Sequence, residues 1–155
     1  MDAPSAIIFY DGLCGLCNRL NPFILKRDRV AVFRFAPLQS EFARDLLAKY
    51  DVEAGDLAML YLLVDQGLPT ERLLSRAEAV LYVLGQLGSI WKVISLLSVL
   101  PDWLLNAAYD LVARNRYRLL GRYDACPLPK PEWRERFIET AVPDPTSQVA
   151  ISLVD

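Results

Sequence analysis

The first half of the chain alternates short apolar runs with stretches in which apolar positions recur at helical spacing. Three runs are rich in β-branched and aromatic residues and predict buried strands, at 6–10, 30–35 and 57–64. The helical spacing predicts helices between them, over about 14–28 and 40–50. After the third run, the turn signal Asp65-Gln66-Gly67 indicates that 70–74 pairs back as a fourth strand.

The second half of the chain has the pattern of successive helices. Ser75-Arg76-Ala77-Glu78 fits a capping box with Ser75 as N-cap, and it opens a helix that extends to about Leu87. Three more helices are expected beyond it, over 89–100, from 102 to about 120, and over 132–140. Asp102 can cap the second of these helices, and Gly121 can end it.

This order of elements predicts one α/β domain over 1–155, with a β-α-β-α-β-β-α core and a helical C-terminal extension over about 89–141 packed on it. Such alternation is typical of a mostly parallel sheet covered by helices, here with a hairpin at its edge. The tail, 142–155, is expected to be disordered or to add one strand at 149–154. A chain of 155 residues can bury roughly 70 % of its unfolded surface, so folding needs no disulfide or metal.

The stretch 79–109 is strongly apolar and carries only Lys92 and Asp102 as charged residues. Glycine, glutamine and proline interrupt it, so it is not expected to span a membrane, which takes about 20 apolar residues in a row. We expect a helix there that is buried on most sides. The alternative is contact with a partner or with a membrane surface.

Composition excludes several classes of protein. A hydrophobic content of 54 % with 23 % charged residues does not fit a disordered chain, and a net charge of −2 argues against a nucleic-acid binder. The chain has no histidine, which excludes a Ser-His-Asp or Cys-His catalytic unit within it and any histidine-ligated zinc or haem. Acid–base chemistry must then come from a carboxylate, lysine, tyrosine or cysteine.

The chain has three cysteines, and an odd count with one close pair does not fit a secreted disulfide framework. The first residues show no signal-peptide pattern, so a cytoplasmic location is expected. In that reducing compartment a Cys-x-x-Cys pair is more often catalytic or metal-binding than structural.

The close pair, Cys14-Gly15-Leu16-Cys17, follows the first predicted strand at the point where a helix should begin. The free N–H groups and dipole of a helix N-terminus favour a thiolate, with pKa values lowered to roughly 3.5–7.5. We expect Cys14 to be exposed at the helix tip and Cys17 to lie one turn inside. Cys14 would attack a substrate disulfide, and Cys17 would then release the product and close the Cys14–Cys17 bond.

Two other interpretations of the cysteines are a half zinc site and packing thiols. A zinc site would need Cys126 and carboxylates to complete four ligands, so no metal and no cofactor is expected. Cys126 itself is expected to be a structural thiol, with a third redox centre as the alternative.

Asp11 and a group of arginines are the charged residues that could act on the pair, and the sequence leaves more than one role open for each. Asp11 can cap or shape the turn, or it can act as the acid–base group that takes the Cys17 proton. Arg114, Arg118 and Arg122 recur every four residues, with Arg116 nearby. They could form a cationic wall that binds an anionic thiol such as glutathione or that lowers the pKa of Cys14. The alternative is a solvated helix end that complements the helix dipole.

Asp11, Cys14 and Cys17 form the pattern D-x-x-C-x-x-C directly after an apolar strand, and the chain thereby resembles the DCC family of thiol-disulfide oxidoreductases. The similarity extends to R-F-A-P-L-Q-S near Phe35, to the helix opening at Ser75 and to R-N-R-Y-R from residue 114. The resemblance implies a thioredoxin-like fold and disulfide exchange.

Thioredoxins are a more distant comparison. Pro22 stands five residues after Cys17, as a proline does in the thioredoxin active-site helix. The residues V-E-A-G-D before Leu57 contain no proline, so the chain lacks the cis-proline that faces the disulfide in thioredoxins.

The function expected first is therefore a thiol-disulfide oxidoreductase, with a disulfide-bearing protein or small thiol as substrate, a separate reductant and no nucleic acid as partner. A second hypothesis is a non-catalytic interaction module that binds a membrane protein or other partner through the apolar helices after Ser89. A phosphatase with Asp11 as nucleophile is disfavoured, because position 13 of the required D-x-D is Leu13.

Overall fold

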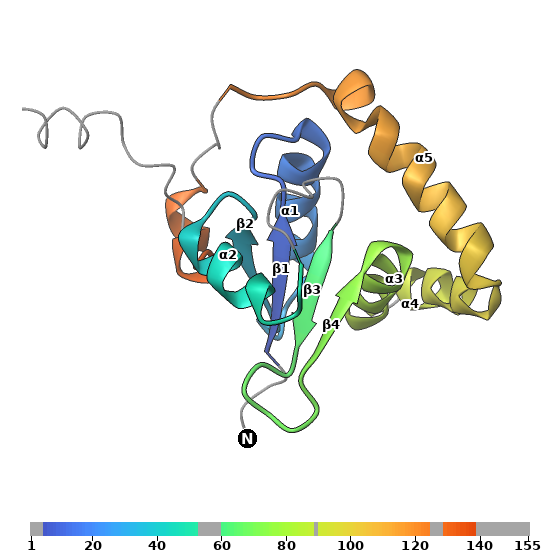
Figure 1. Ribbon diagram of the computed structural model, residues 1–155, viewed down its shortest axis with the longest axis horizontal. Helices are drawn as coiled ribbons and strands as arrows, with labels where there is room; N and C mark the ends of the chain where they lie inside the picture. Colours follow the sequence, from blue (N-terminus) through green and yellow to red (C-terminus); the bar gives the residue numbers. More distant parts are fainter. Residues whose placement is uncertain (1–4, 53–59, 89, 125–128, 139–155) are drawn as a thin grey trace, which may run out of the picture.

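The computed structural model describes residues 5–52, 60–88, 90–124 and 129–138. Its centre is a four-stranded sheet with the order β2-β1-β3-β4 (Figure 1). The strands are β1 (Ala6–Tyr10), β2 (Phe33–Pro37), β3 (Tyr61–Val64) and β4 (Arg72–Ser75). β1 lies in the middle of the sheet, and all five of its residues are buried.

The sheet is mixed, and the expectation of a mostly parallel sheet was wrong. β1 and β2 are parallel, whereas β3 runs antiparallel to β1 and β4 antiparallel to β3. Tyr61 of β3 pairs with Phe9 of β1, so the chain enters β3 at the carboxyl end of β1, and the hairpin then reverses it once more. Alternation of strands and helices along a sequence therefore does not fix strand direction. The mixed sheet with this order fits the expected thioredoxin-like α/β fold.

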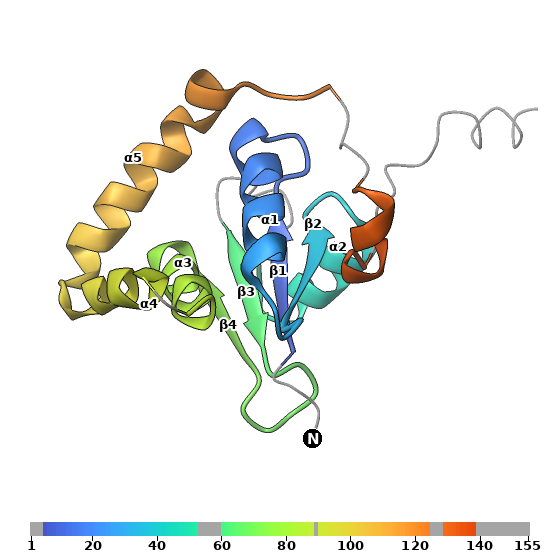
Figure 2. The same ribbon diagram turned by 180° about the vertical axis from the view of Figure 1, so that it is seen from behind.

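Helices cover both faces of the sheet. The helices of the core are α1 (Gly15–Arg27), α2 (Glu41–Ala48) and α3 (Arg76–Gln86). Alternate residues of β1 point to opposite faces, so Ile8 packs with residues of α1 and α3 while Ile7 and Phe9 pack with residues of α2. Figure 2 shows α1 in front of the sheet, on the face opposite α2.

Local side chains set where these elements begin. β2 starts at Phe33 rather than at the expected 30, because the Asp28 carboxylate accepts hydrogen bonds from the N–H groups of Val32 and Phe33, at 3.1 and 2.9 Å, and holds a turn. Ser40 caps α2 by accepting from the N–H of Ala43 at 3.1 Å. Ser75 is the N-cap of α3 as expected, but its side chain makes no capping hydrogen bond, so the capping box is incomplete.

The C-terminal extension consists of α4 (Ile90–Ser95), the 3₁₀ helix η1 (Leu96–Val99), α5 (Asp102–Leu120) and the 3₁₀ helix η2 (Pro131–Arg136). The helix expected over 89–100 is thus broken into α4 and η1, and the one expected over 132–140 is a shorter 3₁₀ helix. α5 ends at Gly121 as expected, in a positive-φ conformation of 78°. Pro101, not Asp102, is its N-cap. The tail at 142–155 lies outside the described residues.

The helices after 89 are exposed, and the expectation that they are buried on most sides was wrong. Among the described residues of α4 and η1 none is buried, and Arg116 is the one buried residue of α5. α4 contacts α3, and α5 contacts α1 and α3. α5 slants away from the sheet in Figure 1. Within the described chain, no helix combines the length and the apolar character needed to cross a bilayer.

Candidate redox site at the start of α1

A tight turn connects β1 to α1 and presents the first cysteine at the helix start. The Asp11 carboxylate accepts from the N–H of Leu13 at 3.0 Å, and the Asp11 carbonyl accepts from the N–H of Cys14 at 3.1 Å. Cys14 is the N-cap of α1, with an extended backbone (ψ 124°). Cys17 lies one turn inside, as expected. Asp11 thus shapes the turn through its side chain without being the helix cap.

Cys14 is fully buried, with 0 % of its surface exposed, which corrects the expectation of an exposed thiol. Residues 121–123, which we call the covering segment, leave α5 and pass over the start of α1 (Figure 1). The N–H of Tyr123 donates to the Leu13 carbonyl at 2.7 Å, and the N–H of Gly15 donates to the Gly121 carbonyl at 3.1 Å. Cys17 is only half-buried.

The glycine between the cysteines is required by this close approach. A Cβ atom at Gly15 would lie 2.1 Å from the carbonyl oxygen of Leu120, far inside van der Waals contact. Any side chain there would push the end of α5 away from the cysteines. The glycine in Cys-Gly-Leu-Cys therefore allows the end of α5 and the covering segment to lie directly against the start of α1.

The two cysteines have opposite pKa shifts. The pKa of Cys14 is lowered to about 6, chiefly because the Cys17 thiol donates a hydrogen bond to its sulfur. Burial opposes the shift, while the backbone N–H groups of Cys17 and Leu16 and the charge of Arg116 reinforce it. The hydrogen bond to Cys14, burial and the charge on Cys14 raise the pKa of Cys17 far above its ordinary value. At neutral pH the pair therefore consists of a Cys14 thiolate and a Cys17 thiol.

The buried carboxylate of Asp11 joins three distant parts of the chain. One of its oxygens accepts from the Gln39 amide at 2.8 Å, and the other accepts from the Tyr117 hydroxyl and from the Arg116 guanidinium, the latter at 3.4 Å. Arg116 and Asp11 form an ion pair in which both side chains are buried. The network fixes the turn before Cys14 and brings a positive charge close to its sulfur.

Of the expected arginines, Arg122 lies beside the pair, since it belongs to the covering segment and forms an isolated β-bridge with Cys14. Arg114 and Arg118 are exposed on α5, and the exposed Arg122 lies with its guanidinium 5.4 Å from the centre of the Tyr117 ring. Arg116 is the arginine whose guanidinium is buried in the site, where it pairs with Asp11. Cys126 lies outside the described residues.

Sequence reasoning did not assign roles to Gln39 and Tyr117, and it considered Arg116 only as a neighbour of the other three arginines, although a signal for all three residues was present. Gln39 belongs to the segment R-F-A-P-L-Q-S, and the other two belong to R-N-R-Y-R. Both segments carried the family resemblance, and both converge on Asp11. In the part of the chain that the structure describes, no group of three or more Cys, Asp or Glu side chains is arranged so that it could hold a metal ion.

Comparison with known proteins identifies a matching family model and related sequences. The family model described as DCC1-like thiol-disulfide oxidoreductase matches residues 8–122. The chain is 30 % identical over 135 residues to the uncharacterized protein YuxK of Bacillus subtilis (strain 168), covering 87 % of this chain and 95 % of that protein. It is 31 % identical over 123 residues to the DCC family protein At1g52590, chloroplastic, of Arabidopsis thaliana, covering 79 % of this chain and 69 % of that protein. No solved structure matches it significantly.

Proposed function

Because the chain belongs to the DCC1-like thiol-disulfide oxidoreductase family, we propose that it exchanges disulfides through Cys14 and Cys17. The observation that carries the proposal is the cysteine pair at the N-terminus of α1, in which Cys17 donates a hydrogen bond to Cys14 and the pKa of Cys14 falls to about 6. A thiolate is the form of cysteine that attacks disulfides, and a second thiol one turn away can release the product.

In the proposed reaction the Cys14 thiolate attacks one sulfur of the substrate disulfide and expels the other as a thiolate. Cys17 then attacks Cys14, releases the second half of the substrate and closes the Cys14–Cys17 disulfide. Two electrons pass from the pair to the substrate, and a separate thiol reductant returns the pair to its reduced form.

Formation of the mixed disulfide also prepares Cys17 to react. The hydrogen bond to the Cys14 thiolate and the charge of that thiolate raise the pKa of Cys17, and both are lost once Cys14 is bonded to the substrate. Cys17 then gives up its proton more easily, and we propose Asp11, whose carboxylate borders the same site, as the group that takes it.

Access to Cys14 requires the covering segment to separate from the start of α1. Two backbone hydrogen bonds hold the segment there, from Gly15 to Gly121 and from Tyr123 to Leu13. Each such bond contributes only about 1 kcal/mol net, so separating the covering segment from α1 costs little free energy.

The substrate would be a disulfide-bearing protein or a small thiol compound, and a reducing compartment such as the cytoplasm would supply the reductant.

Trapping the mixed disulfide tests the proposal. A Cys17→Ser variant, incubated with a small aromatic disulfide, should accumulate a covalent adduct on Cys14 that mass spectrometry locates. Cys126→Ser should leave wild-type exchange unchanged, and Cys14→Ser should abolish it. No adduct on Cys14, together with a wild-type pair that never oxidises in a glutathione titration, contradicts the proposal.

The exposed apolar side chains of the extension support a second candidate function, contact with a membrane protein or other partner. Large apolar residues are exposed along one continuous part of the chain, namely Ile90, Val93, Leu96, Leu97, Val99, Leu100, Trp103 and Leu104. On this interpretation Leu96→Asp abolishes partner binding and Cys14→Ser does not, while circular dichroism shows that both variants are folded. Equal loss in both variants, or in neither, contradicts it.

A further inference from the structure

An apolar cavity of about 460 Å³ opens beside Cys17. Its walls are leucine, isoleucine, valine and alanine side chains from α1, α3, α4, η1 and α5, among them Leu20, Val80, Leu84, Leu97 and Val112. Protein interiors are close-packed, so an apolar space of this size beside a reactive group indicates a binding pocket. The extension contributes lining residues from α4, η1 and α5.

Polar groups gather at one end of this pocket, where Cys17, Asp11 and Arg116 line it. These groups are engaged with the protein: Asp11 binds Arg116, and Cys17 donates to Cys14. The hydroxyl of Tyr109, which also lines the pocket, accepts from the N–H of Leu60 at 2.7 Å. The pocket therefore has little hydrogen-bonding capacity for a polar ligand, and its occupant must be apolar except at the end that reaches the sulfur.

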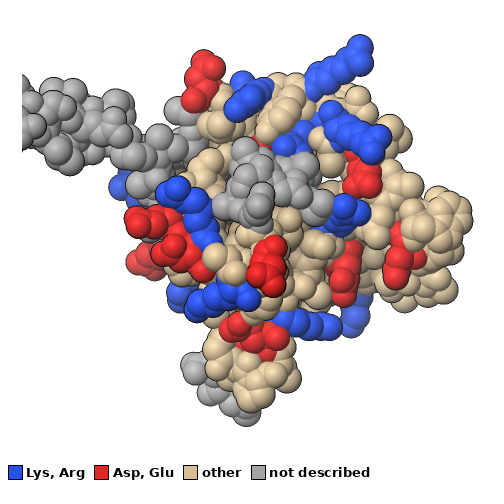
Figure 3. All heavy atoms as spheres, in the orientation of Figure 1, with Lys and Arg blue, Asp and Glu red and all other residues tan. Residues whose placement is uncertain are grey.

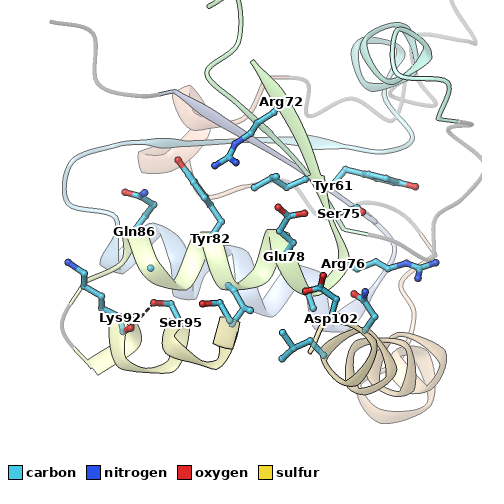
Figure 4. Close-up of a pocket in the computed structure, with 17 residues that line it drawn as sticks. Tyr61, Arg72, Ser75, Arg76, Glu78, Tyr82, Gln86, Lys92, Ser95 and Asp102 are labelled. Atoms are coloured by element: carbon cyan, nitrogen blue, oxygen red, sulfur yellow. Dashed lines mark hydrogen bonds between the residues drawn. The ribbon is translucent and has the colours of Figure 1, made fainter. Parts of the chain in front are cut away.

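A second cavity shows the opposite chemistry. It measures about 940 Å³ and is lined by charged side chains from several elements, including Arg72, Glu78, Lys92 and Asp102 (Figure 4). Charges of both signs are also interspersed over the face of the molecule seen in Figure 3. This polar cavity has no cysteine in its lining. The apolar pocket is the one of the two that reaches a sulfur atom.

We propose that the apolar pocket binds the apolar substituent of the substrate disulfide, so that the protein selects disulfides carrying an aliphatic or aromatic group over hydrophilic ones such as glutathione disulfide. This inference rests on the proposed function. The apolar lining favours an apolar substituent. When η1 and α5 hold such a substituent, its attached sulfur lies at the end of the pocket that Cys17 borders. Glutathione carries carboxylates and peptide groups, and such groups would lose their water in this pocket without gaining partners.

In the step that follows, the substrate S–S bond breaks and the Cys14–Cys17 bond forms. Two electrons pass from the two cysteine sulfurs to the substrate. The first half leaves as a thiolate when Cys14 attacks, and the second half leaves as a thiol with the proton that Cys17 gave up to Asp11. In an assay, a small dithiol such as dithiothreitol then reduces the pair again.

The test compares two mixed disulfides of thionitrobenzoate, one with a hexyl group and one with a hydroxyethyl group, by release of the yellow thionitrobenzoate anion from reduced wild-type protein. The hexyl compound should react at least about tenfold faster at low concentration, since each buried methylene group contributes roughly a factor of four. A pair of peptides with leucine or serine on either side of the disulfide-bonded cysteine shows whether the preference extends from free small molecules to peptides.

A matched pair of variants on α5 links the preference to the pocket. Ala108 lines it and the adjacent Ala107 does not. Ala108→Trp should bring the ratio of the two rates close to one, whereas Ala107→Trp should keep it.

A wild-type ratio below about two, or a ratio that survives Ala108→Trp, overturns the inference while leaving the proposed function intact. If neither compound reacts faster with wild-type protein than with Cys14→Ser, the proposed function fails and the inference fails with it.

Discussion

The sheet core and the helical extension differ sharply in how they are packed. The core, with β1–β4 and α1–α3, contains two clusters of buried apolar residues, one on each face of the sheet. The part of the extension before η2, namely α4, η1 and α5, has Arg116 as its one buried residue within the described chain. Apolar side chains that would normally be buried, such as Trp103 and Val99, are exposed along it.

The difference indicates that the extension serves the site more than it serves stability. Its buried Arg116 and its Tyr117 bind the Asp11 carboxylate, and the covering segment after it closes over Cys14. α5 also forms a wall of the pocket beside Cys17. The core therefore holds the cysteines at a helix start, and the extension sets their charge and their access.

The largest difference between the core and the extension should be in how much a substitution lowers the free energy of unfolding. Phe35 is fully buried and stacks on Phe137 with ring centres 5.2 Å apart, so Phe35→Ala should cost about 3–5 kcal/mol of unfolding free energy. Val99 in η1 is 86 % exposed, and Val99→Ala should change it by less than about 0.5 kcal/mol. Urea unfolding measures both values. Similar losses in the two variants would mean that the extension is part of the stabilising core.

Arg116 should be the exception within the extension. Arg116→Leu leaves the buried Asp11 carboxylate without its cation, which should cost about 3 kcal/mol and also raise the pKa of Cys14. Arg118 is exposed on the same helix, and Arg118→Leu should change neither quantity. Thermal unfolding and the pH dependence of cysteine alkylation measure the two effects. An Arg116→Leu variant that matches Arg118→Leu in both refutes the role given to the ion pair.

Gly15→Ala should loosen the contact between the two regions. The new Cβ would lie 2.1 Å from the Leu120 oxygen, so we expect a cost of about 1–3 kcal/mol and faster alkylation of Cys14 by iodoacetamide as the covering segment moves away. Gly85→Ala is the control, because a Cβ there meets Ser95 at an ordinary 3.6 Å. Unchanged alkylation of Cys14 in Gly15→Ala would show that the covering segment does not control access.

Much of the core could be predicted from sequence because its signals are local. The apolar run 6–10, the helical spacing after residue 14 and the paired cysteines fix β1, α1 and their junction through neighbouring residues alone. The helix expected over 40–50 is present as α2, which begins after its N-cap Ser40, because its apolar spacing is local too. The direction of β3 could not be predicted, since it depends on how the chain returns after α2 and not on any residue within the strand.

The cover over Cys14 and the choice of arginine depend on contacts between segments far apart in the sequence. The cover is formed by residues 121–123, whose own pattern only indicates the end of a helix. The spacing of four suggested that Arg114, Arg118 and Arg122 share one side of a helix, whereas α5 ends at Leu120 and Arg122 lies in the covering segment. The spacing also does not reveal which side of α5 faces the site. The side that does so carries Arg116, and only the packing of α5 against α1 determines this.

The most direct test of the account is a pH titration of the thiolate absorbance of the reduced protein. We expect one ionisation near pH 6 that Cys14→Ser removes, because Cys17 and the N–H groups at the start of α1 stabilise the Cys14 thiolate. Since the thiolate is the reactive form, exchange should be about tenfold slower at pH 5 than on the plateau above pH 7. A protein in which no cysteine ionises until about pH 8.5, the value of an ordinary thiol, would contradict the claim that Cys14 is the activated nucleophile.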